Sequence, residues 1–264
     1  MRRSTIIAAV VAMAASVQSC ILEDRSHCPA YLTLDFSSTP AEVSHINLII
    51  KCADGSVFTD SISSDRFTSV YEIPVPRGRA GIAAFGNIEC MEFADGYRIT
   101  TGNEADNVYT CFFPAVYDRD LCSDSVRLLK NNIGLHIRIT GDSTDSLYTV
   151  ITSSSVGYDL QGEILEGEYV YTPEAAHQTE GERQYLEFFC RIIRQKNDDL
   201  SMSVYGPGGE ILKVLPLSSY LDEAGIDMSD EELDDLYLTL DLAEARLVIS
   251  PIDWTDTGNI QISI

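Results

Sequence analysis

The chain has 264 residues, a formal net charge of −23 and a hydrophobic content of 45%. An excess of 41 acidic over 18 basic side chains argues against nucleic-acid binding and against electrostatic adsorption to anionic lipid, because both need a basic face. The hydrophobic content is ordinary for a folded chain, so the negative charge does not indicate disorder.

The amino terminus has the composition of a secretory signal peptide. Arg2 and Arg3 give a basic start, and residues 6–17 form an apolar run without any charge. Such a run is too short to cross a bilayer as a helix, which takes about 20 residues. We therefore expect residues 1–19 to be a cleaved signal peptide of the kind found on exported proteins.

Cys20 follows directly on the small residue Ser19, an arrangement typical of a bacterial lipobox. We expect acyl chains on Cys20 and a tether over residues 20–30 that holds the protein in the outer membrane. Stable attachment needs more than one acyl chain, which a lipoprotein cysteine typically carries. The acidic pair Glu23 and Asp24 resembles a tag that sends some lipoproteins to the cell surface. The alternative is an ordinary secreted protein in which Cys20 is a plain thiol.

Six further cysteines make disulfides a second expectation for an exported chain. Cys190 alternates with Leu186, Phe188 and Ile192, so we expect it to face a core. Six cysteines allow many pairings, and the sequence does not choose among them. The candidates for disulfide bonds are Cys28, Cys52, Cys90, Cys111 and Cys122.

Alternating apolar and polar residues predict β-strands along most of the chain. Short turns that contain Gly or Asn separate these runs. The runs are residues 31–36, 46–51, 135–140, 200–204, 236–242 and 260–264. Many short strands with frequent turns favour antiparallel β-sandwiches over a parallel sheet with crossover helices. We therefore predict an all-β protein.

One acidic segment predicts a helix. Ser229 and Glu232 have the spacing of a capping box, with acidic residues in what would be the first turn. We expect a short helical insert near 219–235, before the strand at 236–242. The segment lacks the alternating aspartates and central glycine of a calcium loop, so we expect no metal there.

The length that remains after cleavage suits two domains better than one. The polar segment 114–124 lies between two strand-like runs and is the best boundary. We predict a first β-sandwich over residues 31–120 and a second over residues 121–264.

Catalytic motifs are weak in this chain. Asp256-Thr257-Gly258 matches the tripeptide of aspartic proteases, but that chemistry needs two such carboxylates, and this one lies in a turn near the chain end. The four histidines are scattered, and the sequence has no phosphate-binding loop or zinc-protease motif. We predict a protein that is not an enzyme and has neither a cofactor nor a small-molecule substrate.

Several motifs, in order along the chain, resemble the FimB-type fimbrial anchor lipoproteins of type V pili. The first is Cys20 with Glu23 and Asp24, followed by Cys28-Pro29 and the strand 32–36. The later ones are residues 81–87, 215–221, 252–254 and 259–264. The resemblance implies two transthyretin-like β-sandwich domains, a lipid anchor and a place at the base of a fimbria, where the protein would also influence fimbrial length.

The anchor role predicts two partners: the membrane, through Cys20, and a fimbrial stalk subunit, through a shared β-strand. The candidate strand carries Ile260, Ile262 and Ile264 on one face. It could close the chain's own sheet, which we favour, or be donated to the stalk. The competing function is a glycan-binding or tip adhesin lipoprotein. Trp254 is the single tryptophan and the tyrosines are spread along the chain, so no aromatic binding face is indicated.

Overall fold

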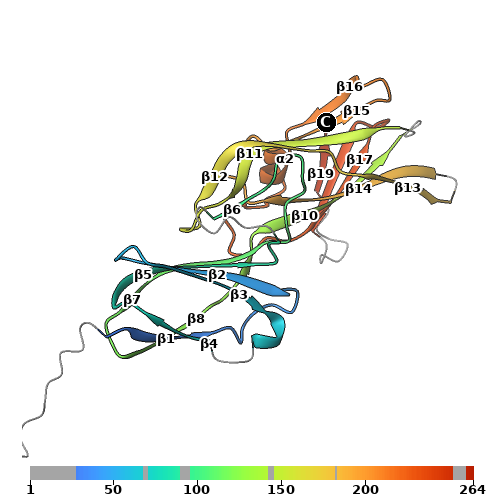
Figure 1. Cartoon of the computed structure of the whole chain (residues 1–264). Coiled ribbons are helices and arrows are strands. Elements are labelled where there is room, and N and C mark those ends of the chain that lie inside the picture. Colours follow the sequence, from blue (N-terminus) through green and yellow to red (C-terminus); the bar gives the residue numbers. More distant parts are fainter. Residues whose placement is uncertain (1–27, 68–70, 90–95, 142–145, 182, 252–259) are drawn as a thin grey trace, which may run out of the picture.

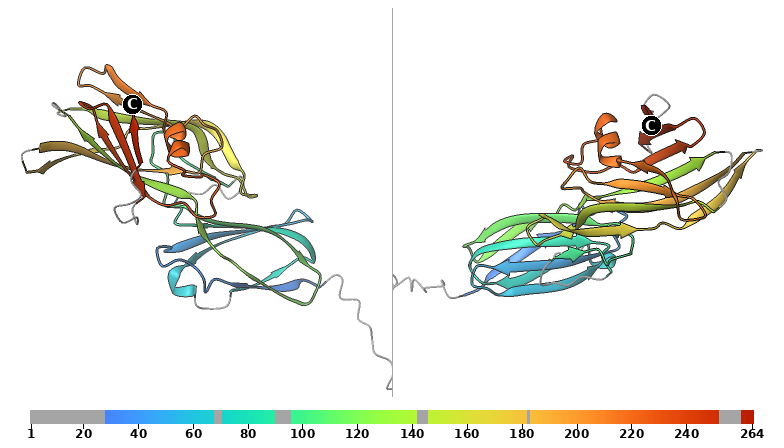
Figure 2. Two further views of the ribbon diagram at one scale, coloured as in Figure 1. Left: turned by 180° about the vertical axis from the view of Figure 1, so that it is seen from behind. Right: turned by 90° about the horizontal axis from the view of Figure 1, so that it is seen from above.

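The computed structural model describes residues 28–67, 71–89, 96–141, 146–181, 183–251 and 260–264. Within these ranges nearly every regular element is a β-strand, which confirms the expected all-β class. The strands form two layered bodies, one above the other in Figure 1, and Figure 2 shows the same division from behind and from above. The last residues before β1 (Ala30–Asp35) enter at the lower body.

The lower body is a sandwich of two sheets. Its other described elements are β2 (His45–Cys52), β3 (Val57–Ser63), the 3-10 turn η1 (Ser64–Arg66), β4 (Tyr71–Val75), β5 (Gly78–Gly86), β7 (Tyr109–Tyr117), β8 (Leu121–Ser125) and β9 (Leu129–Lys130). Among these, one sheet has the order β3-β2-β5-β7-β9 and the other the order β4-β1-β8. All pairs are antiparallel except β1 with β8, which run parallel.

The core of this first sandwich lies between its two sheets. Leu32 and Leu34 of β1 meet Ile46, Leu48 and Ile50 of β2, and all five side chains are buried. The period of two predicted from the sequence is therefore present in both strands. Burying a side chain of this size contributes roughly 1.5–3 kcal/mol relative to leaving it in water, so this row is a main source of the sandwich's stability.

The upper body is a second sandwich. Its described elements are β6 (Tyr97–Arg98), β10 (Asn132–Thr140), β11 (Tyr148–Tyr158), β12 (Ile164–Tyr171), β13 (Ala175–Glu180), β14 (Arg183–Ile193), β15 (Ser201–Tyr205), β16 (Ile211–Leu215), α2 (Leu217–Glu223), β17 (Leu236–Asp241), β18 (Arg246–Pro251) and β19 (Ile260–Ser263). The described strands form one sheet of order β13-β14-β10-β17-β18-β19 and another of order β12-β11-β15-β16, in which β6 also pairs with β11.

The centre of the six-stranded sheet is a parallel pair, β10 with β17. Leu135 stands opposite Leu236 and Ile137 opposite Leu238, and all four side chains are buried. The same register continues to Ile139, so the apolar residues of both strands face one core. These are the residues whose alternation predicted the strands at 135–140 and 236–242.

The two sandwiches meet through an apolar junction. Ile49 of β2 and Ala83 and Phe85 of β5 point away from the first core and belong to the second one. Phe85 packs edge-on against Phe112, with ring centroids 5.2 Å apart. This explains why β2 is buried on both faces although it belongs to a sandwich, since the second sandwich covers its outer face.

The boundary between the sandwiches lies further along the chain than the expected one after residue 120. β8 falls inside the segment expected to be a linker, yet it pairs with β1, and Val126 and Leu128 complete the first core. The last strand of the first sandwich therefore ends at Lys130, although the chain visits the second sandwich once before that, at β6 between β5 and β7. β8 carries polar residues at most positions, so its membership depends on pairing with β1 rather than on an apolar pattern.

The helix also differs from the expected one. α2 ends at Glu223 and buries Leu217 and Leu221, whereas the predicted capping box at Ser229 does not start a helix. The Ser229 N–H instead donates to Oδ1 of Asp227 at 2.7 Å, a local turn that competes with helix formation. In the described part of the chain, no helix has the length and apolar character that crossing a membrane requires.

Candidate functional site

The carboxyl-terminal strand β19 is the candidate partner-binding strand that the structure describes. It pairs antiparallel with β18, with Ile262 opposite Leu247. Ile262 is 4% exposed, and Ile260 and Ile264 are half-buried. The Ile264 N–H donates to the carbonyl oxygen of Ala245 at 3.0 Å. In this structure the strand therefore closes the chain's own sheet.

A hollow of about 120 Å³ lies beside β19, between Ile249 and Ile260 and the loop that follows α2. Its lining includes four carboxylates and no basic residue: Asp227, Asp230, Glu232 and Asp234. Hydrogen bonds from Ser229 hold the pKa of the Asp227 carboxyl below its usual value, so this group stays ionised. The hollow therefore disfavours anionic ligands, because like charges repel.

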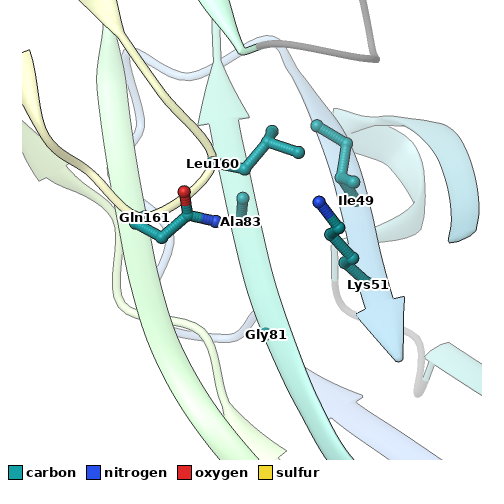
Figure 3. A pocket seen from close by; sticks show the side chains of 6 residues that line it. All are labelled: Ile49, Lys51, Gly81, Ala83, Leu160 and Gln161. Carbon is teal, nitrogen blue, oxygen red and sulfur yellow. The ribbon is translucent and has the colours of Figure 1, made fainter. Parts of the chain in front are cut away.

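A second hollow, of about 200 Å³, lies at the junction of the two sandwiches (Figure 3). Ile49, Ala83 and Leu160 form its apolar wall, and Lys51 and Gln161 supply its polar groups. One ammonium and one carboxamide do not make the paired acid and base that proton-transfer catalysis needs. This hollow therefore offers no catalytic arrangement, and the sequence singled out none of its residues as a functional site.

Polar side chains also link the two sandwiches. Lys130, the last residue of β9, places Nζ 2.5 Å from Oδ1 of Asp235, which also accepts the Gly134 N–H. Next to it, Nε and Nη2 of Arg194 both donate to Oδ1 of Asn131. These contacts join the last crossing of the chain between the sandwiches, from β9 to β10, to other parts of the second sandwich.

Sequence reasoning did not single out this junction. Asn131 and Arg194 are 63 positions apart, and neither lies in a recognisable motif. The only local sign of this junction in the sequence was the polar pair Asn131-Asn132, which lies just before the alternating run 135–140. Residues that matter because of distant partners cannot be found from spacing alone.

The described cysteines are all free in this structure. Cys28 is exposed, Cys111 and Cys122 are half-buried, and Cys52 is buried. Cys190 faces the second core as expected, and burial raises the pKa of its thiol to about 12.

Several residues named from the sequence lie outside the described residues: Cys20, Glu23, Asp24, Cys90, Trp254 and the tripeptide 256–258. Among the residues that are described, no three His, Cys, Asp or Glu side chains gather where they could hold a metal ion.

No family model and no curated protein sequence matches this chain. Solved structures do match it. The fimbrial anchor protein Mfa2 from Porphyromonas gingivalis is 13% identical with a TM-score of 0.62, and the match covers 89% of this chain and 96% of that one. A candidate adhesin from Bacteroides ovatus is 12% identical with a TM-score of 0.64, covering 89% and 95%.

A third match has the same extent. Candidate polysaccharide-binding proteins from Bacteroides thetaiotaomicron are 10% identical, with a TM-score of 0.65, and the match covers 88% of this chain and 98% of that one. At such identities the likeness establishes a shared fold. The resemblance to fimbrial anchor proteins seen in the sequence is thus confirmed at the level of the fold, across nearly the whole of both chains.

Proposed function

We propose that this protein is a non-catalytic lipoprotein of the outer membrane that anchors a fimbria and influences its length. The observation that carries the proposal is that a chain opening with a lipobox at Cys20 has the fold of a fimbrial anchor protein over 89% of its length. An anchor needs a hold on the membrane and a hold on the fimbria. The acyl chains on Cys20 would supply the first.

The geometry of the chain suits this role. The expected tether is followed by β1, which lies at the far end of the molecule from the β15–β16 hairpin (Figure 1). A tether of about ten residues spans at most roughly 35 Å when extended, so the first sandwich would stay close to the membrane and the second would face away from it. Pulling force from a fimbria would then pass through the junction of the two sandwiches, to which the contacts of Asn131 and Lys130 contribute.

The second hold would be a β-strand shared with a stalk subunit. β19 supports this less than the sequence alone did, because Ile262 already fills the chain's own core. Donation of β19 would expose that side chain and break its pairing with β18. A strand that the stalk subunit contributes leaves β19 in place.

The experiment combines a gene deletion with two cysteine variants. Deletion should release fimbriae into the medium or change their length, while fimbrial subunits are still made. Cys20→Ala should abolish incorporation of labelled fatty acid and give the same phenotype. Cys28→Ala is the matched control, because Cys28 is exposed and lies a few residues downstream. Fimbriae that remain attached at normal length in the deletion strain would refute the anchor role.

A surface adhesin is the second candidate, favoured by the adhesin and polysaccharide-binding assignments of two of the structural neighbours. The same strains separate the two functions. An adhesin would leave fimbrial attachment unchanged on deletion and reduce the binding of cells to their target surface. If the protein is an anchor, its deletion would change fimbrial attachment, whichever surface the cells bind to.

A further inference from the structure

Strand β16 lies at an edge of the second sandwich and exposes apolar side chains. Ile211 is 58% exposed, Leu212 46% and Val214 52%. β16 pairs with β15 on one side, and no described strand pairs with its other side. An edge strand offers unpaired N–H and C=O groups to any extended chain that lies beside it, and folded proteins usually protect such edges with charges. Lys213 is the single charged residue of this strand.

The apolar residues continue inward from this edge as a row across three strands. Tyr148 of β11 stands opposite Tyr205 of β15, and their rings stack with centroids 4.9 Å apart. Tyr205 in turn stands opposite Ile211 of β16. A strand added beside β16 would extend this row by one position and bury Ile211, because directly opposite side chains in a sheet contact each other.

The edge is held in an extended shape at both of its ends. At the hairpin end, the Gly206 N–H donates to the carbonyl oxygen of Glu210 at 2.9 Å. At the other end, Leu215 is buried, and Ser218 exchanges hydrogen bonds with the backbone of Leu200 at the start of the hairpin. A preformed edge loses little conformational entropy when a partner strand binds, which favours affinity.

A register shift in the β15–β16 pairing adds to the apolar character of the edge. Tyr205 stands opposite Ile211 and Val204 opposite Lys213, so Leu212 is the extra residue of a bulge. The bulge explains why Ile211 and Leu212 are both exposed, although successive residues of a regular strand point to opposite faces.

The position and the charge of the edge indicate which kind of chain would pair with β16. The hairpin lies at the opposite end of the molecule from β1 in both Figure 1 and the left view of Figure 2, so in the proposed anchor it would face away from the membrane. A second copy is disfavoured, because each chain carries a formal charge of −23 and pairing β16 with β16 would bring two Lys213 side chains to one edge. A different protein chain with alternating apolar residues fits the edge better.

We propose that the free edge of β16 receives an extended apolar strand from the fimbrial subunit next to this protein. The inference rests on the proposed anchor function and names the surface that would hold the fimbria. Main-chain hydrogen bonds to β16 would supply affinity, and contacts with Ile211, Leu212 and Val214 would supply specificity.

The test replaces Val214 by Lys in the full-length lipoprotein and measures the fimbriae that remain on the cells. Val57→Lys is the matched control, since Val57 is 51% exposed and also lies on an edge strand, β3, of the other sandwich. We expect Val214→Lys to retain about tenfold fewer fimbriae than the wild type, while Val57→Lys retains them normally. Equal thermal unfolding temperatures of the purified variants show that both fold.

A binding assay keeps the test independent of expression in cells. Fimbriae sheared from the deletion strain are the probe, and they are mixed with purified mature chain carrying Cys20→Ala. The wild-type surface should bind them, and Val214→Lys should lose about tenfold in affinity. Equal affinity of the wild-type surface and of Val214→Lys for the fimbriae would overturn the proposal. A larger loss of affinity in Val57→Lys than in Val214→Lys would also overturn it.

Two further outcomes identify what has failed. If the complete deletion leaves fimbriae attached, the anchor function itself is wrong. If the deletion releases fimbriae but Val214→Lys retains them, the anchor function holds and β16 is not its binding edge. A purified wild-type chain that dimerises in sedimentation experiments, with a monomeric Val214→Lys variant, would overturn the assignment to a fimbrial subunit and favour a second copy.

Discussion

Arg194 binds Asn131 through two nitrogen atoms, with Nε 3.0 Å and Nη2 2.8 Å from the same oxygen, Oδ1. Asn131 lies between the last strand of the first sandwich and the first long strand of the second. Its carbonyl oxygen also accepts a hydrogen bond from the Tyr158 hydroxyl at 2.7 Å, and its amide group donates to Thr110. One residue thus connects both sandwiches at the last crossing of the chain from the first to the second.

Asn131→Ala should lower the free energy of unfolding by about 1–3 kcal/mol, because it leaves part of the Arg194 guanidinium without its acceptor. The measurement is urea unfolding followed by circular dichroism. Asn197→Ala is the control, since Asn197 is exposed and bonds only to Ser154 among the described residues. It should change stability by less than about 0.5 kcal/mol. An equal loss of unfolding free energy in the two variants would show that the junction contact stabilises the fold no more than a surface hydrogen bond does.

Removal of the C-terminal strand β19 should cause a folding defect. Ile262→Ala should reduce stability by about 2–4 kcal/mol, because the side chain is almost fully buried and truncation leaves a cavity. Ile264→Ala should cost less, since Ile264 is only half-buried. Deletion of residues 259–264 should prevent the second sandwich from folding. A truncated chain that folds normally but no longer holds fimbriae would instead favour donation of this strand to the stalk.

Glu104, which lies between β6 and β7, should make the free energy of unfolding depend on pH. Burial raises the pKa of Glu104 above its ordinary value of 4.5 despite the ion pair with Arg191. The folded chain therefore holds this proton more tightly than the unfolded chain does. The resulting stability is present below the ordinary pKa and is lost as the pH rises through the raised value.

Glu104→Gln should remove the part of this pH dependence that comes from Glu104, because a glutamine side chain does not titrate. Relative to the wild type, the free energy of unfolding of the variant should rise as the pH increases from about 4 to 7. Asp54→Asn should show the opposite slope, but at pH values below the ordinary pKa of 3.8, because hydrogen bonds from Ser56 lower the pKa of Asp54. Stability curves measured by urea unfolding at each pH give the comparison. Parallel curves for Glu104→Gln and the wild type would contradict the assignment.

Thiol labelling tests the cysteines. In the native protein, Cys28 should react first with a maleimide, because it is the exposed one of the described cysteines. Cys190 should not react until the chain is unfolded, since it is buried and its thiol pKa is raised to about 12. Mass spectrometry of the digested protein locates the label. A Cys28 that reacts only after reduction would reveal a disulfide.

The sequence by itself determined the fold class and the strands that have a clear alternation of apolar and polar residues. Where every second residue is apolar, as in Leu135, Ile137 and Ile139, one face of the strand has to be buried, and this requirement holds whatever the partner strand is. The prediction of a lipid anchor at Cys20 likewise uses only residues that are neighbours in the chain.

Tertiary structure decided everything that depends on distant partners. β8 belongs to the first sandwich because β1 pairs with it, and no pattern within its own polar sequence shows this. The helix forms at Leu217 rather than at Ser229 because its apolar side chains find a core there. β19 closes its own sheet because β18 lies beside it. In each case the deciding contact joins residues whose separation in the chain carries no information about their separation in space.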